Sequence, residues 1–524
     1  MRRHNFILIL FILVFVLTGC NLQRNSPPAF IPPSGIERTV TANWEALVHA
    51  ATQTASSLEI TKAAPLAPTQ TTPDPPTPTV TPTPFSGAPL LYYTQAGDTL
   101  HSVTIRFDAS AEEISSPGPI PKTGFINPNQ LLIIPHRLKN TTSAKHLMPD
   151  SEVVYSPSAQ NFDTVSFVNQ SQGYLSTYKE YLGSTGTTSG AKLLENTALN
   201  NSINPRLLLA LLEYQGGWVL GSPDNLAKQD YPYGLIELKK KGLLHQIHWA
   251  VNQLSIGYYG WREGRLTEIH FSDGVTARLA PDLNAGTAAL QYFFAQIYDS
   301  QQWLKVLDPE TGFPALYKKM FGNPWLRAQS VEPLFPPDLV QPKLNLPFLI
   351  GPIWSYTGGP HGAWEVDGSR AAIDFAPAST QSGCVKSDSW VTASAAGLIT
   401  RSRNGVVALD LDGDGSEQTG WVMIYLHIAT EGRIAQGKWV ESGDLLGHPS
   451  CEGGRATGTH IHIARKFNGE WMAADGPIPF VLSGWRVHAG EKPYKGTLTR
   501  GEETIKANQY GSYESQIQRT KDDP

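Results

Sequence analysis

The chain contains two histidines separated by one residue, in the segment Gly458-Thr459-His460-Ile461-His462. Side chains alternate between the two faces of an extended strand, so His460 and His462 share one face and Ile461 lies on the other. The glycines before the pair favour a loop that leads into the strand. The segment therefore predicts a β-domain in which one imidazole can bind a metal while the other faces a substrate. A His-x-His pair alone does not establish a metal site, so partners are needed elsewhere in the chain.

The first 20 residues have the character of an export signal. A basic start, Arg2-Arg3-His4, precedes an apolar run that is too short for a comfortable membrane span, and the segment ends in Leu17-Thr18-Gly19-Cys20. This ending resembles the lipobox of bacterial lipoproteins, in which the cysteine is lipidated and becomes the mature N-terminus. The resemblance implies a signal peptide over residues 1–20, lipidation of Cys20, and a membrane-anchored protein of the cell envelope. The alternative is an uncleaved N-terminal anchor.

Length and charge limit the classes of protein to consider. A chain of 524 residues is too long for one core, and roughly two to four domains are expected. The formal net charge of -5 argues against a nucleic-acid-binding protein, which normally carries a basic field. An exported compartment permits disulfides, so Cys384 and Cys451, which lie in the same late region, can form a bonded pair.

Residues 21–88 contain little that could form a core. The run from Thr71 to Pro84 is mostly proline and threonine, which favours an extended, polyproline-like chain. We expect a stalk that holds the later domains away from a lipid surface, with one short helix between Trp44 and Leu58.

Residues 89–138 resemble a LysM module, a small βααβ fold that binds glycans containing N-acetylglucosamine. The resemblance rests on the turn Gly97-Asp98-Thr99-Leu100, where Asp98 or Thr99 can cap a helix, and on the closing apolar run Asn129–Pro135. Between them, Ser115–Pro121 replaces the helical second half that the pattern requires. The resemblance implies glycan binding, and the alternative is a structural spacer.

Residues 150–335 are expected to form a mainly helical domain. Leu290, Phe293, Phe294 and Ile297 recur at helical spacing, and Leu207–Leu212 form another apolar segment that starts after a proline.

The run Ile203–Trp218 is similar to the catalytic helix of lysozyme-like lytic transglycosylases, in which a glutamate is the general acid. Gln215 stands at the position of that glutamate, and a carboxamide cannot donate and recover a proton. Glu213 is acidic, but two residues along a helix turn it by about 200° to another face. We therefore expect a domain of lysozyme-like ancestry that is non-catalytic and could still hold a glycan.

The last domain is expected over residues 344–490. Trp390–Ile399 and Trp421–His427 are typical of strands, and Asp410–Gly415 between them is typical of a hairpin tip, so the pattern predicts an antiparallel β-domain. Asp410, Asp412 and Asp414 resemble the opening of a calcium-binding EF-hand loop. Trp421 occupies the twelfth position, where that loop needs a bidentate glutamate, so a polar hairpin tip is favoured.

A zinc site that hydrolyses a substrate needs three protein ligands and one open position for water. Asp374 is the best carboxylate, because it lies in the apolar strand Ala371–Pro377, where an unpaired charge would be costly. His361 precedes it on a loop rich in glycine and proline and can fold back towards it.

His361, Asp374, Tyr425-Leu426-His427 and the His-x-His segment together resemble the lysostaphin-type zinc metallopeptidases, which cleave peptide cross-links of peptidoglycan. Most members place the first ligand four residues before the aspartate, where this chain has Arg370, whose guanidinium cannot bind zinc. The beta-lytic branch of the family has a longer separation, which suits His361. Cys451-Glu452-Gly453-Gly454 also resembles that branch, in which the cysteine is disulfide-bonded, here implied with Cys384.

The resemblance assigns a role to each residue. His361, Asp374 and His462 would bind Zn²⁺, and a water in the fourth position would have its pKa lowered from about 15.7 to about 7. His460 would act as general base, and His427 would steady the oxyanion or protonate the leaving amine. His448 and His488, in loop-like contexts, are expected to be solvated, and residues 491–524 form a polar tail without a functional signal.

The resulting hypothesis is an envelope lipoprotein that hydrolyses peptide cross-links of peptidoglycan, with the LysM-like and helical modules placing it on this polymer. One alternative is a non-enzymatic wall-binding protein that activates another hydrolase. Such proteins typically lose metal ligands, and this chain retains all of them. Another alternative is a muramidase that acts through the helical domain.

Overall fold

The computed structural model of the chain describes residues 88–183 and 186–523, all of which belong to one compact unit, Pro84–Pro524. The predicted signal peptide, Cys20 and the predicted stalk up to residue 87, including its short helix, lie outside the described residues. No helix in the described part of the chain has both the length and the apolar character that crossing a membrane requires.

The LysM-like module is a small antiparallel sheet of two strands that packs on one helix. Strands β1 (Leu90–Tyr93) and β2 (Leu131–Ile134) pair antiparallel, and α2 (Leu100–Phe107) packs against them. Thr99 is the residue that caps α2, through a reciprocal pair of hydrogen bonds with Ser102. The prediction of two helices is wrong for the second one, which is reduced to the 3₁₀ turn η1 (Ala111–Glu113) before a proline-rich stretch.

Residues 150–335, predicted to form a mainly helical domain, contain the helices α3 to α12. α6 starts where the sequence indicated, since Asn204 caps it and Pro205 occupies its first position. Residues 207–212 are five leucines and one alanine, and all of them are buried. This part of α6 is therefore enclosed on every side. The helices are α3 (Thr164–Ser171), α4 (Tyr174–Thr177), α5 (Gly190–Asn201), α6 (Pro205–Gly216), α7 (Leu226–Asp230), α8 (Leu243–Arg262), α9 (Ala285–Ala295), α10 (Ser300–Val306), α11 (Phe313–Phe321) and α12 (Pro324–Ala328). Two short hairpins accompany them, β3 (Lys179–Leu182) with β4 (Gly186–Ser189) and β5 (Glu268–His270) with β6 (Thr276–Arg278).

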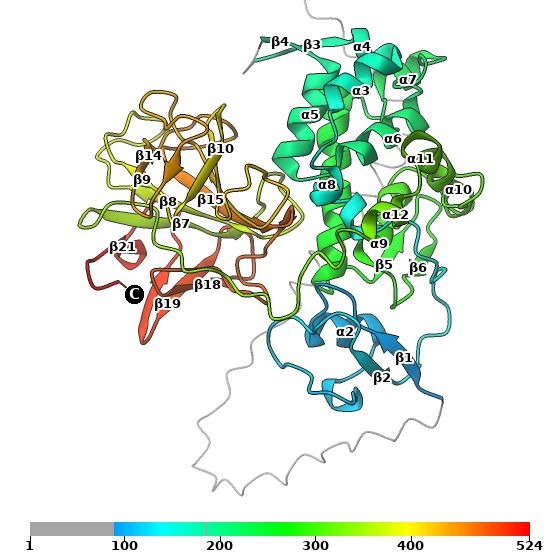
Figure 1. Cartoon of the computed structure of the whole chain (residues 1–524), viewed down its shortest axis with the longest axis horizontal. Coiled ribbons are helices and arrows are strands. Elements are labelled where there is room, and N and C mark those ends of the chain that lie inside the picture. The colour runs from blue at the N-terminus through cyan, green and yellow to red at the C-terminus, as the bar shows by residue number, and fades with distance from the viewer. Residues whose placement is uncertain (1–87, 184–185, 524) are drawn as a thin grey trace, which may run out of the picture. The chain divides into compact units, whose positions relative to one another are not determined.

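The last domain is built on an antiparallel sheet of nine strands, which confirms the predicted β-domain. The strand order is β13-β10-β11-β12-β15-β8-β7-β21, with β16 paired to β15. Its strands are β7 (Ile353–His361), β8 (Ala372–Pro377), β10 (Gly397–Arg403), β11 (Val406–Asp410), β12 (Trp421–Leu426), β13 (Trp439–Val440), β15 (Ile461–Phe467), β16 (Glu470–Trp471) and β21 (Gln516–Gln518). Smaller sheets pair β9 (Val391–Thr392) with β14 (Leu445–Gly447), and β17 (Val481–Leu482), β18 (Trp485–Ala489), β19 (Gly496–Arg500) and β20 (Glu503–Lys506) in that order. In Figure 1 these strands run from yellow-green to red, and the helices of the preceding domain from cyan to green.

The structure corrects three expectations for this domain. The single strand predicted over Trp390–Ile399 is wrong, because β9 and β10 are separated by a bend and pair with different strands. His361 is not on a loop but is the last residue of β7, where it pairs with Ala372. Residues 491–524 are not a separate tail, since they supply β19, β20 and β21, and β21 pairs with β7.

Both faces of the large sheet are buried, each in a different core. Along β12, Val422 and Ile424 pack in the core that contains the helices, whereas Met423 and Tyr425 pack in the core of the β-domain. Trp471 joins the two domains directly, because its indole N–H donates to the carbonyl oxygen of Asn201 on α5 (3.1 Å). The helical domain and one face of the sheet therefore share a continuous hydrophobic core.

A buried arginine links all three described modules. The Arg262 guanidinium at the end of α8 donates to Asp150 Oδ2 (2.8 Å) and to Glu470 Oε1 (3.0 Å) on β16. It also donates to the carbonyl oxygen of Ala96 in the LysM-like module. Buried charges are stable only when paired and hydrogen-bonded, so this junction fixes the three modules through one side chain.

Glu332 lies beside this junction and has a raised pKa. Burial and, next, the Asp150 carboxylate raise the pKa of Glu332 from 4.5 to about 7. The folded chain therefore holds this proton more tightly than the unfolded chain, and the free energy of unfolding decreases as the pH rises from about 4.5 to about 7.

We expect Glu332→Gln to raise the free energy of unfolding by about 2 kcal/mol at pH 8 and by much less at pH 4.5. The amide oxygen of glutamine can still accept the Ser151 N–H that now donates to Glu332 Oε1 (2.8 Å). Urea unfolding at the two pH values measures this difference, and Glu310→Gln at an exposed site serves as the control. A gain of equal size at both pH values would contradict the prediction.

Candidate metal centre

Three neighbouring strands bring His361, Asp374 and His462 together. His361 ends β7, Asp374 lies in the middle of β8, and His462 lies near the start of β15. His462 is directly opposite Asp374 in the strand register. The three side chains are buried and offer one ligand atom each within 4.8 Å of one another.

The three ligand atoms form a nearly equilateral triangle. His361 Nε2 lies 3.0 Å from His462 Nδ1 and 3.4 Å from Asp374 Oδ1, and the remaining edge, from His462 Nδ1 to Asp374 Oδ1, is 3.3 Å. Ligand atoms of a tetrahedral zinc site with bonds of about 2.0 Å lie about 3.3 Å apart. Two imidazoles and one carboxylate are also ligands that zinc prefers, so these residues fit the ion that the sequence predicted.

Backbone carbonyls fix the tautomers of both candidate ligand histidines. His361 Nδ1 lies 2.9 Å from the carbonyl oxygen of Gly359, and His462 Nε2 lies 2.9 Å from that of Ala363. A carbonyl only accepts hydrogen bonds, so these two nitrogens carry the protons. The other nitrogen of each ring therefore points a lone pair into the triangle.

Asp374 supplies a buried oxygen that lacks a hydrogen-bond donor. This atom is Oδ1, and it accepts no hydrogen bond from any described residue. Burial opposes the ionisation of Asp374, but His361 in its protonated form holds the pKa of this carboxyl well below its usual value. Burial lowers the pKa of His361, and the Asp374 carboxylate outweighs that effect, so the net pKa is raised. The triangle therefore favours a positive charge at its centre.

Gly358 on β7 makes room for this carboxylate. A Cβ atom at position 358 would lie 2.4 Å from Asp374 Oδ2, which is closer than real contacts allow. The glycine is thus needed for the close approach of β7 to the aspartate.

His460 and His427 lie beside the triangle with their tautomers fixed in the same way. His460 Nδ1 donates to the carbonyl oxygen of Gly458 (2.7 Å), and His427 Nδ1 donates to that of Glu452 (2.8 Å). The two rings are 4.5 Å apart between centroids, and His460 Nε2 lies 3.9 Å from Asp374 Oδ1. The Nε2 lone pairs of both rings are therefore available as proton acceptors.

His427 differs from its predicted place and is electrically neutral. It follows the end of β12 instead of lying on the strand, and its φ of 66° turns the chain sharply. Burial, and then the neighbouring His460 and His462, lower the pKa of His427 to about 3. Near neutral pH this imidazole therefore has a lone pair at Nε2 and no second N–H to donate.

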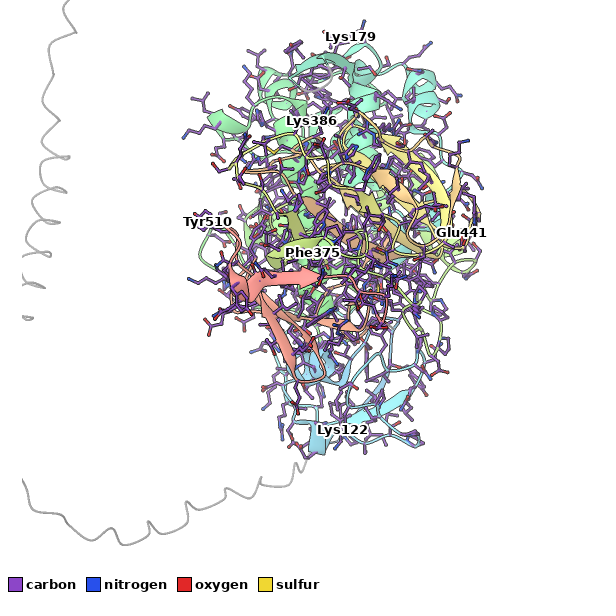
Figure 2. The ribbon with its side chains drawn as sticks, turned by 90° about the vertical axis from the view of Figure 1, so that its left-hand side faces the viewer. Lys122, Lys179, Phe375, Lys386, Glu441 and Tyr510 are labelled. Carbon is purple, nitrogen blue, oxygen red and sulfur yellow. A yellow bond between two sulfur atoms is a disulfide. The ribbon has the colours of Figure 1, made fainter. Side chains whose placement is uncertain are left out.

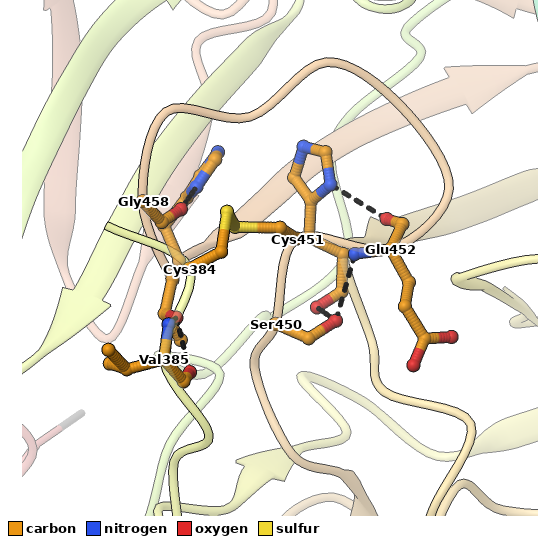
Figure 3. Close-up of a disulfide and its surroundings, with 9 residues drawn as sticks. Cys384, Val385, Ser450, Cys451, Glu452 and Gly458 are labelled. Atoms are coloured by element: carbon orange, nitrogen blue, oxygen red, sulfur yellow. Dashed lines mark hydrogen bonds between the residues drawn. A yellow bond between two sulfur atoms is a disulfide. The ribbon is translucent and has the colours of Figure 1, made fainter. Parts of the chain in front are cut away.

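A disulfide between Cys384 and Cys451 holds the loop that orients both of these histidines (Figure 3). Glu452 and Gly458, whose carbonyls accept from His427 and His460, lie on the loop that contains Cys451. Hydrogen bonds reinforce the link, because Val385 N donates to Thr459 Oγ1 (2.9 Å).

This group of side chains lies at the wall of an open cleft of about 1900 Å³. The five predicted site residues all line it: His361, Asp374, His427, His460 and His462. The sequence analysis missed Tyr494, whose ring stacks on His361 with centroids 4.1 Å apart. Burial raises the pKa of Tyr494, so its hydroxyl stays protonated. Tyr510 and Tyr513 lie at the rim, each 88% exposed, and Figure 2 shows Tyr510 at the outer edge of the molecule.

The other candidates from the sequence take structural roles. His448 packs on Trp390, with centroids 3.9 Å apart, so it is not simply solvated. His488 lies in β18, not in a loop, and its Nε2 pairs with the hydroxyl of Thr499 (2.8 Å).

Asp410, Asp412 and Asp414 do form the predicted hairpin tip between β11 and β12. Their ligand atoms lie within 4.8 Å of one another. However, Asp410 and Asp414 already accept backbone N–H groups of the same turn, from Gly415 and Ser416 at 2.8 Å each. These carboxylates are therefore used to stabilise the turn.

The two polar residues of α6 that could suggest glycosidase chemistry are also engaged. Glu213 Oε2 accepts the backbone N–H groups of Val219 (2.8 Å) and Leu220 (2.9 Å), so it closes the turn after the helix. Gln215 Oε1 accepts the hydroxyl of Tyr298 (2.8 Å). The acid function that a muramidase needs stays without a candidate on this helix.

Comparisons with known proteins relate both large domains to one kind of protein. A family model described as the N-terminal domain of LasA matches residues 146–334. Two Protease LasA sequences from Pseudomonas aeruginosa, strains UCBPP-PA14 and PAO1, are 24% and 25% identical to this chain over 371 and 372 residues, covering 67% of this chain and 80% of each relative. The chain is similar to a protease over most of its length. The lysozyme-like ancestry of the helical domain stays a prediction.

Two similarities to solved structures cover smaller parts of this chain. The M23 metalloprotease pseudoalterin, from the deep sea, is 24% identical with a TM-score of 0.28, covering 32% of this chain and 96% of that protein. The catalytic domain of lysostaphin from Staphylococcus simulans is 21% identical with a TM-score of 0.17, covering 23% of this chain and 87% of that one.

We expect the chain to bind one zinc ion per molecule and His462→Ala to bind none, because the substitution removes a corner of the triangle. Elemental analysis after gel filtration measures the zinc content. His488→Ala, which changes a histidine outside the cleft, should keep the full content. Zinc retained at full stoichiometry by His462→Ala would contradict the assignment.

We expect Gly358→Ala to weaken zinc binding at least about 10-fold although it removes no ligand, because its Cβ displaces the Asp374 carboxylate. Competition with a chromophoric chelator measures the dissociation constant. Gly221→Ala, where an added Cβ would meet its nearest neighbour at 3.8 Å, is the matched control. Unchanged affinity in Gly358→Ala would show that Asp374 is not held by this contact.

Proposed function

We propose that the chain is a zinc metalloendopeptidase that hydrolyses peptide cross-links of peptidoglycan. The observation that carries this proposal is the buried triangle of His361 Nε2, Asp374 Oδ1 and His462 Nδ1 beside His427 and His460 in an open cleft. The similarity to proteases named LasA supports a peptidase. The resemblance of the site motifs to lysostaphin-type enzymes supports peptidoglycan as the substrate.

The protein side chains divide the reaction between them. Zinc, when bound by His361, Asp374 and His462, would polarise the scissile carbonyl and make a water molecule more acidic. His460 Nε2 carries a lone pair towards the cleft, because its Nδ1–H is held by Gly458, so His460 would accept the proton of the attacking water.

His427 needs a proton before it can act as a donor. With a pKa of about 3 and its Nδ1–H held by Glu452, His427 offers only a lone pair at Nε2. It would therefore take up the proton that His460 has accepted from the water and pass it on to the leaving amine. Neutral His427 has no hydrogen-bond donor for the cleft. The hydroxyl of Tyr494, which lines the same cleft, stays protonated and can donate, and we assign it to stabilising the oxyanion.

The remaining modules would place the peptidase on its polymer. We propose a lipid anchor at Cys20 and glycan binding by the LysM-like module. The residues just before the turn that carries the resemblance to LysM are used for packing, since Gln95 Nε2 donates to the carbonyl oxygen of Asp282 (2.9 Å). Glycan would therefore contact the outward side chains Leu91 and Tyr93 of β1, each 60% exposed.

We expect purified peptidoglycan treated with the zinc-loaded protein to release fragments with new amino termini and no new reducing sugars. Mass spectrometry and a reducing-sugar assay measure the two products. His460→Ala should lower the rate by about 10²- to 10⁴-fold while it keeps its zinc, because only proton transfer is removed.

His488→Ala, outside the cleft, is the matched control and should cleave at the normal rate. New reducing sugars would identify a muramidase instead. A protein that binds peptidoglycan and zinc but releases nothing would support the non-enzymatic alternative.

A further inference from the structure

The loop between β7 and β8, residues 362–371, contacts a metal-ligand candidate from the side opposite to the cleft. Its Ala363 carbonyl oxygen accepts the Nε2–H of His462 (2.9 Å), and this bond decides which nitrogen of His462 faces the triangle. The loop turns tightly at Gly362, where a Cβ atom would lie 2.0 Å from the carbonyl oxygen of Glu365. The position of this carbonyl therefore depends on what holds the loop.

One face of helix α8 holds the loop. His248 Nδ1 lies 2.8 Å from Glu365 Oε1, and Asn252 exchanges two hydrogen bonds with Asp367, through its Oδ1 (3.2 Å) and its Nδ2 (3.4 Å). Residues 248, 252 and 255 recur at intervals of four and three, so they lie on the same face of the helix.

The third residue of this face is Ser255, which touches the loop backbone. Gly368 has a φ of +114°, and a Cβ atom there would lie 2.9 Å from the Cβ of Ser255. Arg265, just after α8, donates to the carbonyl oxygen of Gly368 (3.0 Å). Ala363 itself is buried in the core that contains the helices. The loop thus lies between the helical domain on one side and His462 on the other.

We propose that α8 is part of the metal centre. The face of this helix that contains His248, Asn252 and Ser255 positions His462 through the carbonyl of Ala363. This inference rests on the zinc site of the proposed function and extends it to a second domain. His248 and Asn252 are positioning residues, because they contact neither the ion nor a substrate.

The physical basis is the orientation of an imidazole by its outer hydrogen bond. Removing such a partner typically weakens metal binding by about 10- to 100-fold, because the ring can then rotate or shift its proton to the ligating nitrogen. His248 and Asn252 act one step further out, through the loop. We therefore expect an effect at the lower end of this range.

The test is the full chain with the double substitution His248→Ala/Asn252→Ala. The zinc dissociation constant, measured by chelator competition, should rise about 10-fold, and the visible absorption spectrum of the cobalt(II)-loaded protein should change. The melting temperature of the metal-free protein should stay within a few degrees, since both side chains lie at the partly exposed border of the helix.

The matched control is His245→Ala/Gln253→Ala on the same helix. His245 is exposed and Gln253 is half-buried, and neither side chain makes a hydrogen bond or an ion pair with another described residue. This control should keep both the affinity and the cobalt spectrum. His248→Asn, which can place an amide N–H where Nδ1 lies, should restore most of the affinity.

Gly368→Ala tests the same contact without removing a polar group, because its Cβ would push the loop away from Ser255. It should change the cobalt spectrum in the same direction. Unchanged affinity and spectrum in both the double variant and Gly368→Ala would overturn the inference. The proposed function would stay intact in that case, provided that the parent chain binds zinc. A parent chain that binds no zinc would overturn the proposed function, and this inference with it.

Discussion

Three electron-rich atoms, His361 Nε2, Asp374 Oδ1 and His462 Nδ1, lie between 3.0 and 3.4 Å apart in a buried place. Such a group is costly to bury unless a positive charge lies among its members. The carboxylate oxygen has no donor among the described residues, and both nitrogens have their protons on the far side of the ring. The surrounding structure can be understood as the means of holding these three atoms in place.

Strands supply the ligands, and backbone carbonyls supply their orientation. Each of the four histidines of the cleft donates one ring N–H to a carbonyl oxygen, and the acceptors are Gly359, Ala363, Glu452 and Gly458. Two of these acceptors lie on the disulfide-bonded loop at Cys451, and Ala363 lies on the loop held by α8. Long-range packing therefore decides which nitrogen of each ring donates to a carbonyl and which one keeps a lone pair.

The sequence predicted which residues lie together at the site better than it predicted the contacts that surround them. The alternation in His460-Ile461-His462 and the apolar surroundings of Asp374 are local patterns, so they indicated an antiparallel β-domain and one buried carboxylate, both of which the structure contains. A carbonyl acceptor has no such signature, because every residue has one. Tyr494 was missed for a similar reason: it reaches His361 through a backbone pairing with Gly359, which no local pattern reveals. The metal and catalytic roles themselves stay predictions.

The buried second face of the sheet explains why the helical domain matters to the site. The pattern of β12 predicts a strand with apolar residues on alternating positions, but every residue from Val422 to Leu426 is buried. Val422 and Ile424 meet the helices, so this face would meet water if the helical domain were absent. The same domain holds the loop that orients His462. A substitution on α8 can therefore act on the metal centre in two separable ways, through the shared core and through the loop. The partly exposed side chains of His248 and Asn252 isolate the second way, because they contact the loop and are not part of the core.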